Sequence, residues 1–377
     1  MKDDFESIRP FNEDEIPAAT QRIAESDLIP VICSYLMPNT PVEALRIRIK
    51  NISTSYEFQR DLLVDVVEKL LKKTTDGFDC SGMENIQKGM PCLFVSNHRD
   101  IVLDAMLLQY VLCVGGYKTS YIAFGDNLMY DGLVTDFWKV NKMFQIHRGG
   151  TRMEFYNHLL LVSKYINYLI GEKKESVWIS QRNGRTKDGV DFTDPAVLKM
   201  FGMSCEGDRR SQYASLNIVP VSVSYEWEPC DKMKALELYY TQRDGAYQKQ
   251  PNEDLNSILT GITQPKGHVF IRLCPRINDH DLAELGQCRA SDFFKQLALL
   301  IDNRIYSHYM LTPNNFIAHD LRDGTSAYAD RYTAEQKEAF VSYMSWIDDY
   351  VNLDRNELKS IFLGIYANPV DSYRKTK

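Results

Sequence analysis

A histidine and two aspartates stand close together in the segment SNHRDIVLDAMLL, residues 96–108. His98 follows an apolar run typical of a buried strand, and the ends of strands are where α/β folds place functional groups. A carboxylate partner fixes the tautomer of an imidazole and stabilises its protonated form, which a general base requires. Asp100 and Asp104 lie four residues apart, on one face of a helix, so either could be that partner. Taken alone, the segment is better explained by a helix cap at Asp100 and ordinary polar contacts at His98.

Two further segments combine arginine with glycine. The first, VNKMFQIHRGGTR (140–152), holds Arg148, and the second, VWISQRNGRTKDG (177–189), follows another apolar run. Glycine allows a backbone to approach a ligand closely, and arginine matches the geometry of phosphate. The second segment therefore predicts an anion site with four candidate residues: Arg182, Gly184, Arg185 and Lys187. Each segment alone also fits a turn with solvated charges, and the second lacks the GxxxxGK[ST] order of a phosphate-binding P-loop.

A fourth segment is the apolar run NIVPVSVSYEWEP, residues 217–229. Pro220 within it predicts the start or the edge of a strand, since proline cannot donate to the hydrogen-bond ladder of a sheet. Tyr225 and Glu226 lie at the end of the run. A plain core strand explains most of this segment.

The elements that must position these residues alternate along the chain. Short apolar runs predict five buried strands, at 91–96, 119–124, 176–180, 217–225 and 268–274. Helical spacing of apolar residues predicts helices at 56–73, 104–114 and 153–170. Strands that alternate with helices predict an α/β fold, in which a mixed, largely parallel sheet is flanked by helices.

Helical segments are expected on both sides of this α/β domain. The sequence predicts three regions: an N-terminal helical region (1–84), the α/β domain (85–310) and a C-terminal helical extension (311–377). In the extension, Thr333 and Asp354 have the sequence context of helix caps.

The composition argues against several classes of protein. The 377 residues are 44% apolar and 25% charged, a globular balance that excludes a disordered, collagen-like or polytopic membrane protein. A net charge of −7 argues against a nucleic-acid partner. The eight cysteines form no CxxC pair, so we expect reduced thiols rather than disulfides or a zinc site. The acidic N-terminus lacks the apolar core of a signal peptide, and the longest apolar stretch (105–114) is shorter than the ~20 residues of a spanning helix.

The order and spacing of the four segments carry a resemblance. A His and an Asp after a strand, an Arg-Gly turn about fifty residues later, an Arg/Gly loop and the strand VPVSVSYE follow one another. This series resembles the four conserved blocks of the glycerolipid acyltransferases, which include the glycerol-3-phosphate and 1-acylglycerol-3-phosphate acyltransferases. The resemblance spans roughly residues 85–275. There are two departures: five residues separate His98 from Asp104 where the family has four, and QRNGRTKDG lacks the family's Glu.

The resemblance implies a mechanism and a set of roles. His98 would be the general base on an acceptor hydroxyl, oriented by Asp104, which the apolar helix after it favours, or by Asp100. Arg148, and Arg185 with its neighbours, would hold the acceptor's phosphate or another anion. The acyl donor would be an acyl thioester, either acyl-CoA or acyl-carrier protein, and no cofactor or metal is expected.

Two alternatives remain open on the sequence, and so does the place of membrane contact. The unusual third segment is compatible with a lipid acceptor that carries no phosphate. The shifted His–Asp spacing and the missing Glu are compatible with a non-catalytic lipid-binding scaffold of the same fold. Because the substrates are lipids, we expect a cytoplasmic protein with peripheral contact at the inner face of a membrane, through residues 1–73 or the C-terminal extension.

Overall fold

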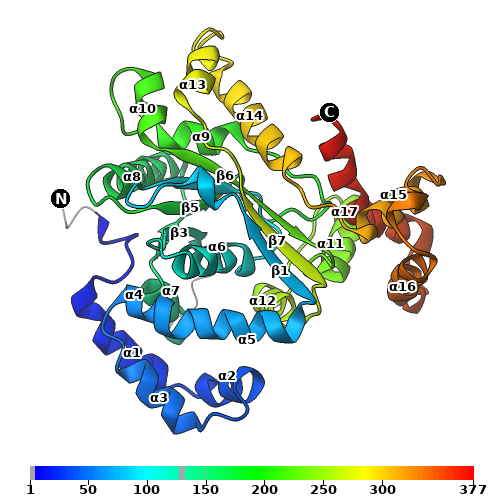
Figure 1. Cartoon of the computed structure of the whole chain (residues 1–377), viewed down its shortest axis with the longest axis horizontal. Helices are drawn as coiled ribbons and strands as arrows, with labels where there is room; N and C mark the ends of the chain where they lie inside the picture. The colour runs from blue at the N-terminus through cyan, green and yellow to red at the C-terminus, as the bar shows by residue number, and fades with distance from the viewer. Residues whose placement is uncertain (1–4, 127–131, 148) are drawn as a thin grey trace.

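A seven-stranded sheet forms the centre of the chain. The computed structural model describes residues 5–126, 132–147 and 149–377 (Figure 1). The strands are β1 (Gly77–Ser81), β2 (Leu93–Ser96), β3 (Tyr121–Gly125), β4 (Met143–Ile146), β5 (Val177–Ser180), β6 (Ile218–Tyr225) and β7 (His268–Leu273). Their order across the sheet is β1-β7-β6-β2-β5-β3-β4, and every neighbouring pair is parallel except β6 and β7. The predicted α/β class with a largely parallel sheet is confirmed.

Five of these strands correspond to the five predicted ones, and β1 and β4 were not predicted. Both lie at the edges of the sheet, where a strand pairs on one side only. β1 has the sequence GFDCS, whose residues are half-buried or exposed, so its periodicity gives a weak signal. β4 has four residues, too few for an apolar pattern to distinguish it from a turn. β1 lies in the predicted N-terminal region, and the division into three regions stays a prediction.

Apolar side chains cover the two faces of the sheet in two separate clusters. Along β2, Leu93 and Val95 belong to one cluster and Phe94 to the other, as the two-residue period of a strand requires. The first cluster is closed by α8 (Arg152–Gly171), α9 (Pro195–Phe201), α10 (Arg209–Ser215), α13 (Asp279–Leu285) and α14 (Phe293–Ser307). The second is closed by α5 (Val64–Thr74), α6 (Leu103–Val114) and α7 (Leu133–Val140). The helix predicted at 104–114 is α6, and that at 153–170 is α8.

The chain before the sheet is helical, as predicted. It contains α1 (Ile16–Glu25), α2 (Leu28–Leu36), α3 (Val42–Lys50), α4 (Ser55–Glu57) and the π-helical segment η3 (Phe58–Leu63), which runs into α5. The helix predicted at 56–73 is therefore made of α4, η3 and α5. An ion pair between Arg22 and Asp136, 2.7 Å long, fastens α1 to α7 beside the sheet.

Two helices lie between β6 and β7, and three close the chain. They are α11 (Asp231–Asp244), α12 (Glu253–Thr263), α15 (Pro313–Asp323), α16 (Ala334–Met344) and α17 (Arg355–Arg374). The last three pack with α11 into a separate apolar cluster at one end of the molecule (Figure 1). Thr333 and Asp354 cap α16 and α17 through their side chains, as the sequence predicts. Among the described residues, no helix combines the length and the apolar character needed to cross a bilayer.

Candidate active site

The turn between β2 and α6 holds His98 at the centre of the sheet. β2 lies between β6 and β5, so the turn after it is surrounded by neighbouring strand ends. Asn97 fixes the turn to β6, because its side chain donates to the Val223 carbonyl (3.0 Å) and accepts from the Val223 N–H (2.8 Å). On the other side, the Thr186 N–H donates to the His98 carbonyl at 2.7 Å. The backbone of His98 is therefore held from two directions.

Asp104 is the carboxylate that contacts His98. His98 Nδ1 lies 2.9 Å from Asp104 Oδ2, and the same oxygen accepts the backbone N–H groups of Arg99 (2.6 Å) and Asp100 (2.9 Å). Asp104 stands in the first turn of α6, and its carboxylate folds back over the turn that precedes the helix. The extra residue between His98 and Asp104 is accommodated in this turn, and the pair still meets.

Asp100 caps the start of α6 with its side chain, from the turn before the helix. Its Oδ1 accepts the backbone N–H groups of Val102 (2.9 Å) and Leu103 (2.8 Å) at the start of α6. Its Oδ2 is buried and has no hydrogen-bond partner among the described residues. Burial raises the pKa of Asp100, and the nearby Asp104 carboxylate raises it further. The structure therefore brings Asp104, and not Asp100, to the imidazole.

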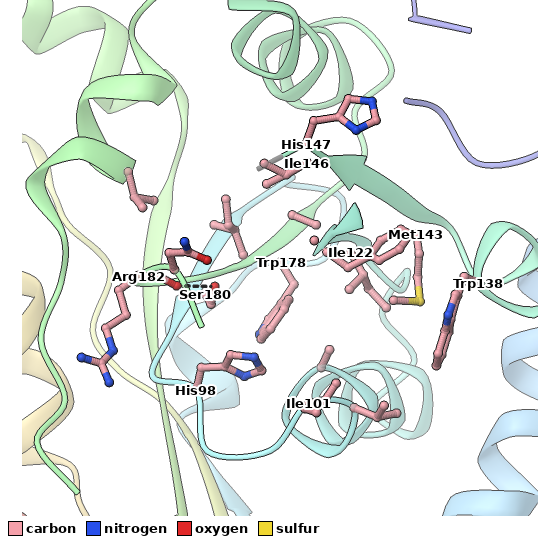
Figure 2. A pocket seen from close by; sticks show the side chains of 18 of the residues that line it. His98, Ile101, Ile122, Trp138, Met143, Ile146, His147, Trp178, Ser180 and Arg182 are labelled. Atoms are coloured by element: carbon pink, nitrogen blue, oxygen red, sulfur yellow. Dashed lines mark hydrogen bonds between the residues drawn. The ribbon is translucent and has the colours of Figure 1, made fainter. Parts of the chain in front are cut away.

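His98 opens onto a cavity of about 340 Å³ with mostly apolar walls. Figure 2 shows its ring beside Trp178, whose ring centroid lies 5.8 Å away, edge to face. Since Nδ1 faces Asp104, Nε2 is the ring nitrogen left for a substrate. The apolar walls come from η3, α6 and the turn before it, β3, α7, β4, α8, β5 and α9, with these residues prominent: Ile101, Met106, Ile122, Trp138, Met143 and Phe155.

Arg182 is the cation that the loop after β5 brings to the cavity. Arg182 and Asn183 both line its wall. The Arg182 guanidinium lies over the Phe192 ring, 4.5 Å from the centroid, and its Nε is buried without a hydrogen-bond partner in the described part of the chain. In the described part of the chain, the neighbouring cations Arg99 and Lys187 form ion pairs, and Arg182 forms none. A cation without a carboxylate partner at the wall of a cavity is suited to an anionic ligand.

The other residues predicted for the anion site lie elsewhere. Arg185 donates to the Ser257 hydroxyl on α12 at 2.9 Å, and Lys187 pairs with Glu237 on α11. Gly184 has a φ of +76°, a left-handed conformation that suits glycine in this tight loop. None of the three lines the cavity. Arg148 lies outside the described residues.

A buried carboxylate that the sequence did not single out joins the parts of the site. Asp191 accepts hydrogen bonds from Arg99 (2.7 Å) and Asn97 (3.0 Å), and from the hydroxyls of Thr186 and Tyr309. Burial by itself would raise the pKa of Asp191, but Arg99 and the hydroxyl and amide donors outweigh it and hold that pKa below its ordinary value. Asp191 follows directly after the predicted loop, yet an isolated Asp in sequence gives no sign of such partners.

Within the described residues, no group of three or more His, Cys, Asp or Glu side chains is arranged to hold a metal ion. The chemistry that the described side chains offer is that of a polar pair, an imidazole and a carboxylate, at one end of an apolar cavity. Such a pair can take a proton from a hydroxyl group.

The chain is similar to known proteins over part of its length. Residues 77–180, from β1 to the end of β5, match the family model described as Acyltransferase. No curated protein matches the sequence. Among solved structures, the 1-acyl-sn-glycerophosphate (LPA) acyltransferase PlsC from Thermotoga maritima is 13% identical, with a TM-score of 0.39. The match covers 76% of this chain and 91% of that chain.

Proposed function

We propose that this chain, which is an acyltransferase by its domain in residues 77–180, moves a fatty acyl group from an acyl thioester to a hydroxyl of glycerol-3-phosphate or a lysophospholipid. The observation that carries this proposal is the contact of His98 with Asp104, 2.9 Å long, at the end of an apolar cavity. The polar pair suits a hydroxyl group, and the cavity suits a hydrocarbon chain.

The proposed reaction needs one proton acceptor. Nε2 of His98 takes the proton of the acceptor hydroxyl while its oxygen attacks the thioester carbonyl carbon. The tetrahedral intermediate then collapses, the carbon–sulfur bond breaks, and the leaving thiolate takes the proton from His98. Asp104 holds the ring in one tautomer and stabilises the imidazolium that exists between the two steps. No covalent enzyme intermediate is required.

The apolar cavity is the proposed site of the acyl chain. Its walls offer apolar side chains from eight elements of the described chain, and each methylene buried against such walls contributes roughly 0.8 kcal/mol. Figure 2 shows Trp178 next to the imidazole and the side chains of Ile122, Met143 and Trp138 further away in the same cavity. An acyl group whose carbonyl lies beside His98 would place its chain along these walls. Both acyl-CoA and acyl-carrier protein remain proposed donors.

Arg182 is the proposed ligand of the acceptor's phosphate. It lies on the cavity wall and has no carboxylate partner in the described part of the chain. Arg185 and Lys187 were predicted for the same role, but their side chains contact α12 and α11. Among the described residues, that arrangement leaves Arg182 as the one Arg or Lys at the wall, which also keeps a second proposal open: an acceptor lipid without phosphate.

A non-catalytic scaffold is the weakest of the three hypotheses. Two departures support it: the shifted spacing between His98 and Asp104, and the missing Glu in QRNGRTKDG. Against it, the side chains of His98 and Asp104 are within hydrogen-bond distance. This contact supports an enzyme over a scaffold.

The test is an acyl-transfer assay on the purified chain. Acyl-CoA and acyl-carrier protein are supplied separately, each with glycerol-3-phosphate, a lysophospholipid or a hydroxylated lipid without phosphate. We expect product with a phosphate acceptor, competition by inorganic phosphate, and a loss of about 10²–10⁴-fold in kcat for His98→Ala. An active His98→Ala enzyme would contradict the role of His98 as the general base. Product only from the phosphate-free lipid would move the proposal to the second acceptor class.

Two arginines of one loop test the anion site. We expect Arg182→Ala to raise KM for the phosphate acceptor with little change in kcat, because the contact is made equally in the ground and transition states. Arg185→Ala is the matched control, since it removes the same charge from the same loop. If Arg185→Ala raises KM and Arg182→Ala does not, the assignment of Arg182 is wrong.

A further inference from the structure

We infer that Tyr225 is a positioning residue of the site: its hydroxyl group orients Asp104 and tunes how strongly that carboxylate holds the His98 imidazolium. The inference rests on the proposed function, since it assigns a role within the same pair. Tyr225 ends β6, in the segment whose sequence alone indicates only a core strand.

The contacts of Asp104 are divided between its two oxygens. Oδ2 accepts His98 and two backbone N–H groups, whereas Oδ1 accepts the Tyr225 hydroxyl at 2.8 Å. No other hydrogen bond to Oδ1 occurs among the described residues. Asp104 is fully buried and Tyr225 is 5% exposed, so water cannot readily replace the hydroxyl.

The tyrosine is held where it can only donate. β6 is fixed on both sides, by β2 through the Asn97 contacts and by β7 through the pairing of Tyr225 with Val269. Burial, and then the Asp104 carboxylate, raise the pKa of the Tyr225 hydroxyl well above its ordinary value. The hydroxyl therefore stays protonated and gives its hydrogen to Oδ1.

The chemical consequence has a definite direction. A donor on Oδ1 draws negative charge away from Oδ2, which weakens the attraction of Asp104 for a protonated His98. Without the hydroxyl, Asp104 would hold the imidazolium more strongly, and His98 would stay protonated to a higher pH. A protonated imidazole cannot take a proton from the acceptor. The tyrosine thus keeps His98 available as a base.

Other charged groups surround the pair and would be unchanged by a substitution at Tyr225. They come from the start of α6, the loops after β5 and β6, and the segment after α12: Asp100, Arg182, Arg185, Glu228 and Lys266. These groups are the same in the wild type and in a Tyr225 variant, so a difference between their pH profiles is assigned to the loss of the Tyr225 hydroxyl.

The test is Tyr225→Phe, which keeps the ring and removes the donor. We expect kcat/KM at neutral pH to fall about 3–10-fold, the acid limb of its pH profile to move to higher pH, and activity to recover at alkaline pH. Tyr332→Phe is the matched control. Tyr332 also donates to a buried carboxylate, Asp320, at 2.8 Å, but it lies between α15 and α16, and neither residue lines the cavity. Tyr332→Phe should lower stability without moving the pH profile.

A profile of unchanged shape for Tyr225→Phe would overturn the inference, because a purely structural role lowers activity equally at every pH. If Tyr225→Phe fails to fold, 3-fluorotyrosine at position 225 keeps the hydroxyl and makes it a stronger donor, and the acid limb should move to lower pH; no movement would overturn the inference. NMR titration of the His98 imidazole, which needs no substrate, should give the same shifts. That readout separates a failure of this inference from a failure of the proposed function.

Discussion

At the scale of single residues, the Asp104 carboxylate is held by more hydrogen bonds than its partner, the His98 side chain. Its two oxygens accept four hydrogen bonds, from His98, Tyr225 and two backbone N–H groups, so the carboxylate is held in one orientation. We expect Asp104→Asn to lower kcat about 10²–10⁴-fold, because an amide cannot stabilise an imidazolium in the same way. The measurement is kcat with a saturating acyl donor, together with the melting temperature.

Asp100→Asn is the control for that experiment. Asp100 is equally buried and stands four residues away, but its Oδ1 caps α6 and an amide oxygen keeps that role. We expect its kcat to fall less than about tenfold. Equal losses in both variants would contradict the assignment of Asp104 as the partner of His98.

Asp302 gives a pH dependence of stability at the same scale. Its Oδ1 accepts the N–H (2.7 Å) and the hydroxyl (2.6 Å) of Thr193, and burial raises its pKa to about 6 from the ordinary value of 3.8. Because the folded pKa is the higher one, the stability linked to this group is fully present below the ordinary value and is lost as pH rises through the folded value of about 6.

Asp302→Asn keeps the acceptor oxygen and cannot ionise. We therefore expect the variant to gain free energy of unfolding relative to wild type as pH rises from about 4 to 6, by up to about 3 kcal/mol, and the gain to level off above that. Urea unfolding across this pH range is the measurement. A difference that does not vary with pH would rule out Asp302 as the titrating group.

At the residue scale, the sequence predicted His98 as the base and left either Asp100 or Asp104 as its partner. Only the fold distinguishes the two aspartates. The choice depends on how the turn after β2 folds back, which a count of intervening residues does not reveal. The roles of Asp191 and Tyr225 could not be predicted for another reason. Their partners, Arg99 and Asp104, lie 92 and 121 residues away in the chain. Contacts of that separation leave no local pattern in a single sequence.

At the scale of elements, α12 supports the start of α6 through a glycine. A Cβ placed on Gly261 would lie 2.0 Å from Asp100 Oδ2, so the two helices can approach only because position 261 has no side chain. We expect Gly261→Ala to push α12 away from the Asp100 cap, to lower the free energy of unfolding by about 1–3 kcal/mol and to lower kcat through the adjacent His98–Asp104 pair.

Gly364→Ala in α17 is the matched control for this prediction. A Cβ there would meet only the Asn368 side chain, at 3.6 Å, which is an ordinary contact. Alanine at this helical position should raise stability by about 0.5–1 kcal/mol and leave kcat unchanged. The measurements are thermal unfolding and kcat on both variants. If Gly261→Ala changes neither the stability nor kcat, α12 does not support the site.

The sequence predicted those strands and helices whose burial produces an apolar run or a periodic apolar pattern. The central strands β2, β5 and β6 are buried on both faces, and their apolar runs are plain in the sequence. The edge strands β1 and β4 carry no such run, and η3 departs from the α-helical spacing that its apolar residues indicate. Sequence patterns therefore report the core of this fold better than its edges.

At the scale of the whole molecule, the proposed lipid substrates require contact with a membrane. In the described part of the chain, exposed apolar side chains lie on α8 and α2, among other places. At the start of α8, Met153 is 68% and Tyr156 53% exposed, and the neighbouring Phe155 both reaches the surface and lines the cavity. On α2, Leu28 and Val31 are 48% and 60% exposed, but no residue of α2 lines the cavity. A lipid that leaves a membrane at α8 would meet the cavity directly.

We therefore expect Met153→Ser/Tyr156→Ser to reduce sedimentation with phosphatidylcholine vesicles, because each exposed apolar side chain that inserts contributes roughly 1.5–3 kcal/mol. Since the chain carries a net charge of −7, adding phosphatidylglycerol should weaken binding rather than strengthen it. Leu28→Ser/Val31→Ser tests the rival surface, and Val114→Ser, at a 61% exposed apolar residue at the end of α6, is the control. Activity on a water-soluble short-chain thioester should be equal in all variants. Loss of vesicle binding in the α2 variant alone would place the contact on the N-terminal helices, one of the two regions that the sequence predicted, and would leave the α8 surface without this role.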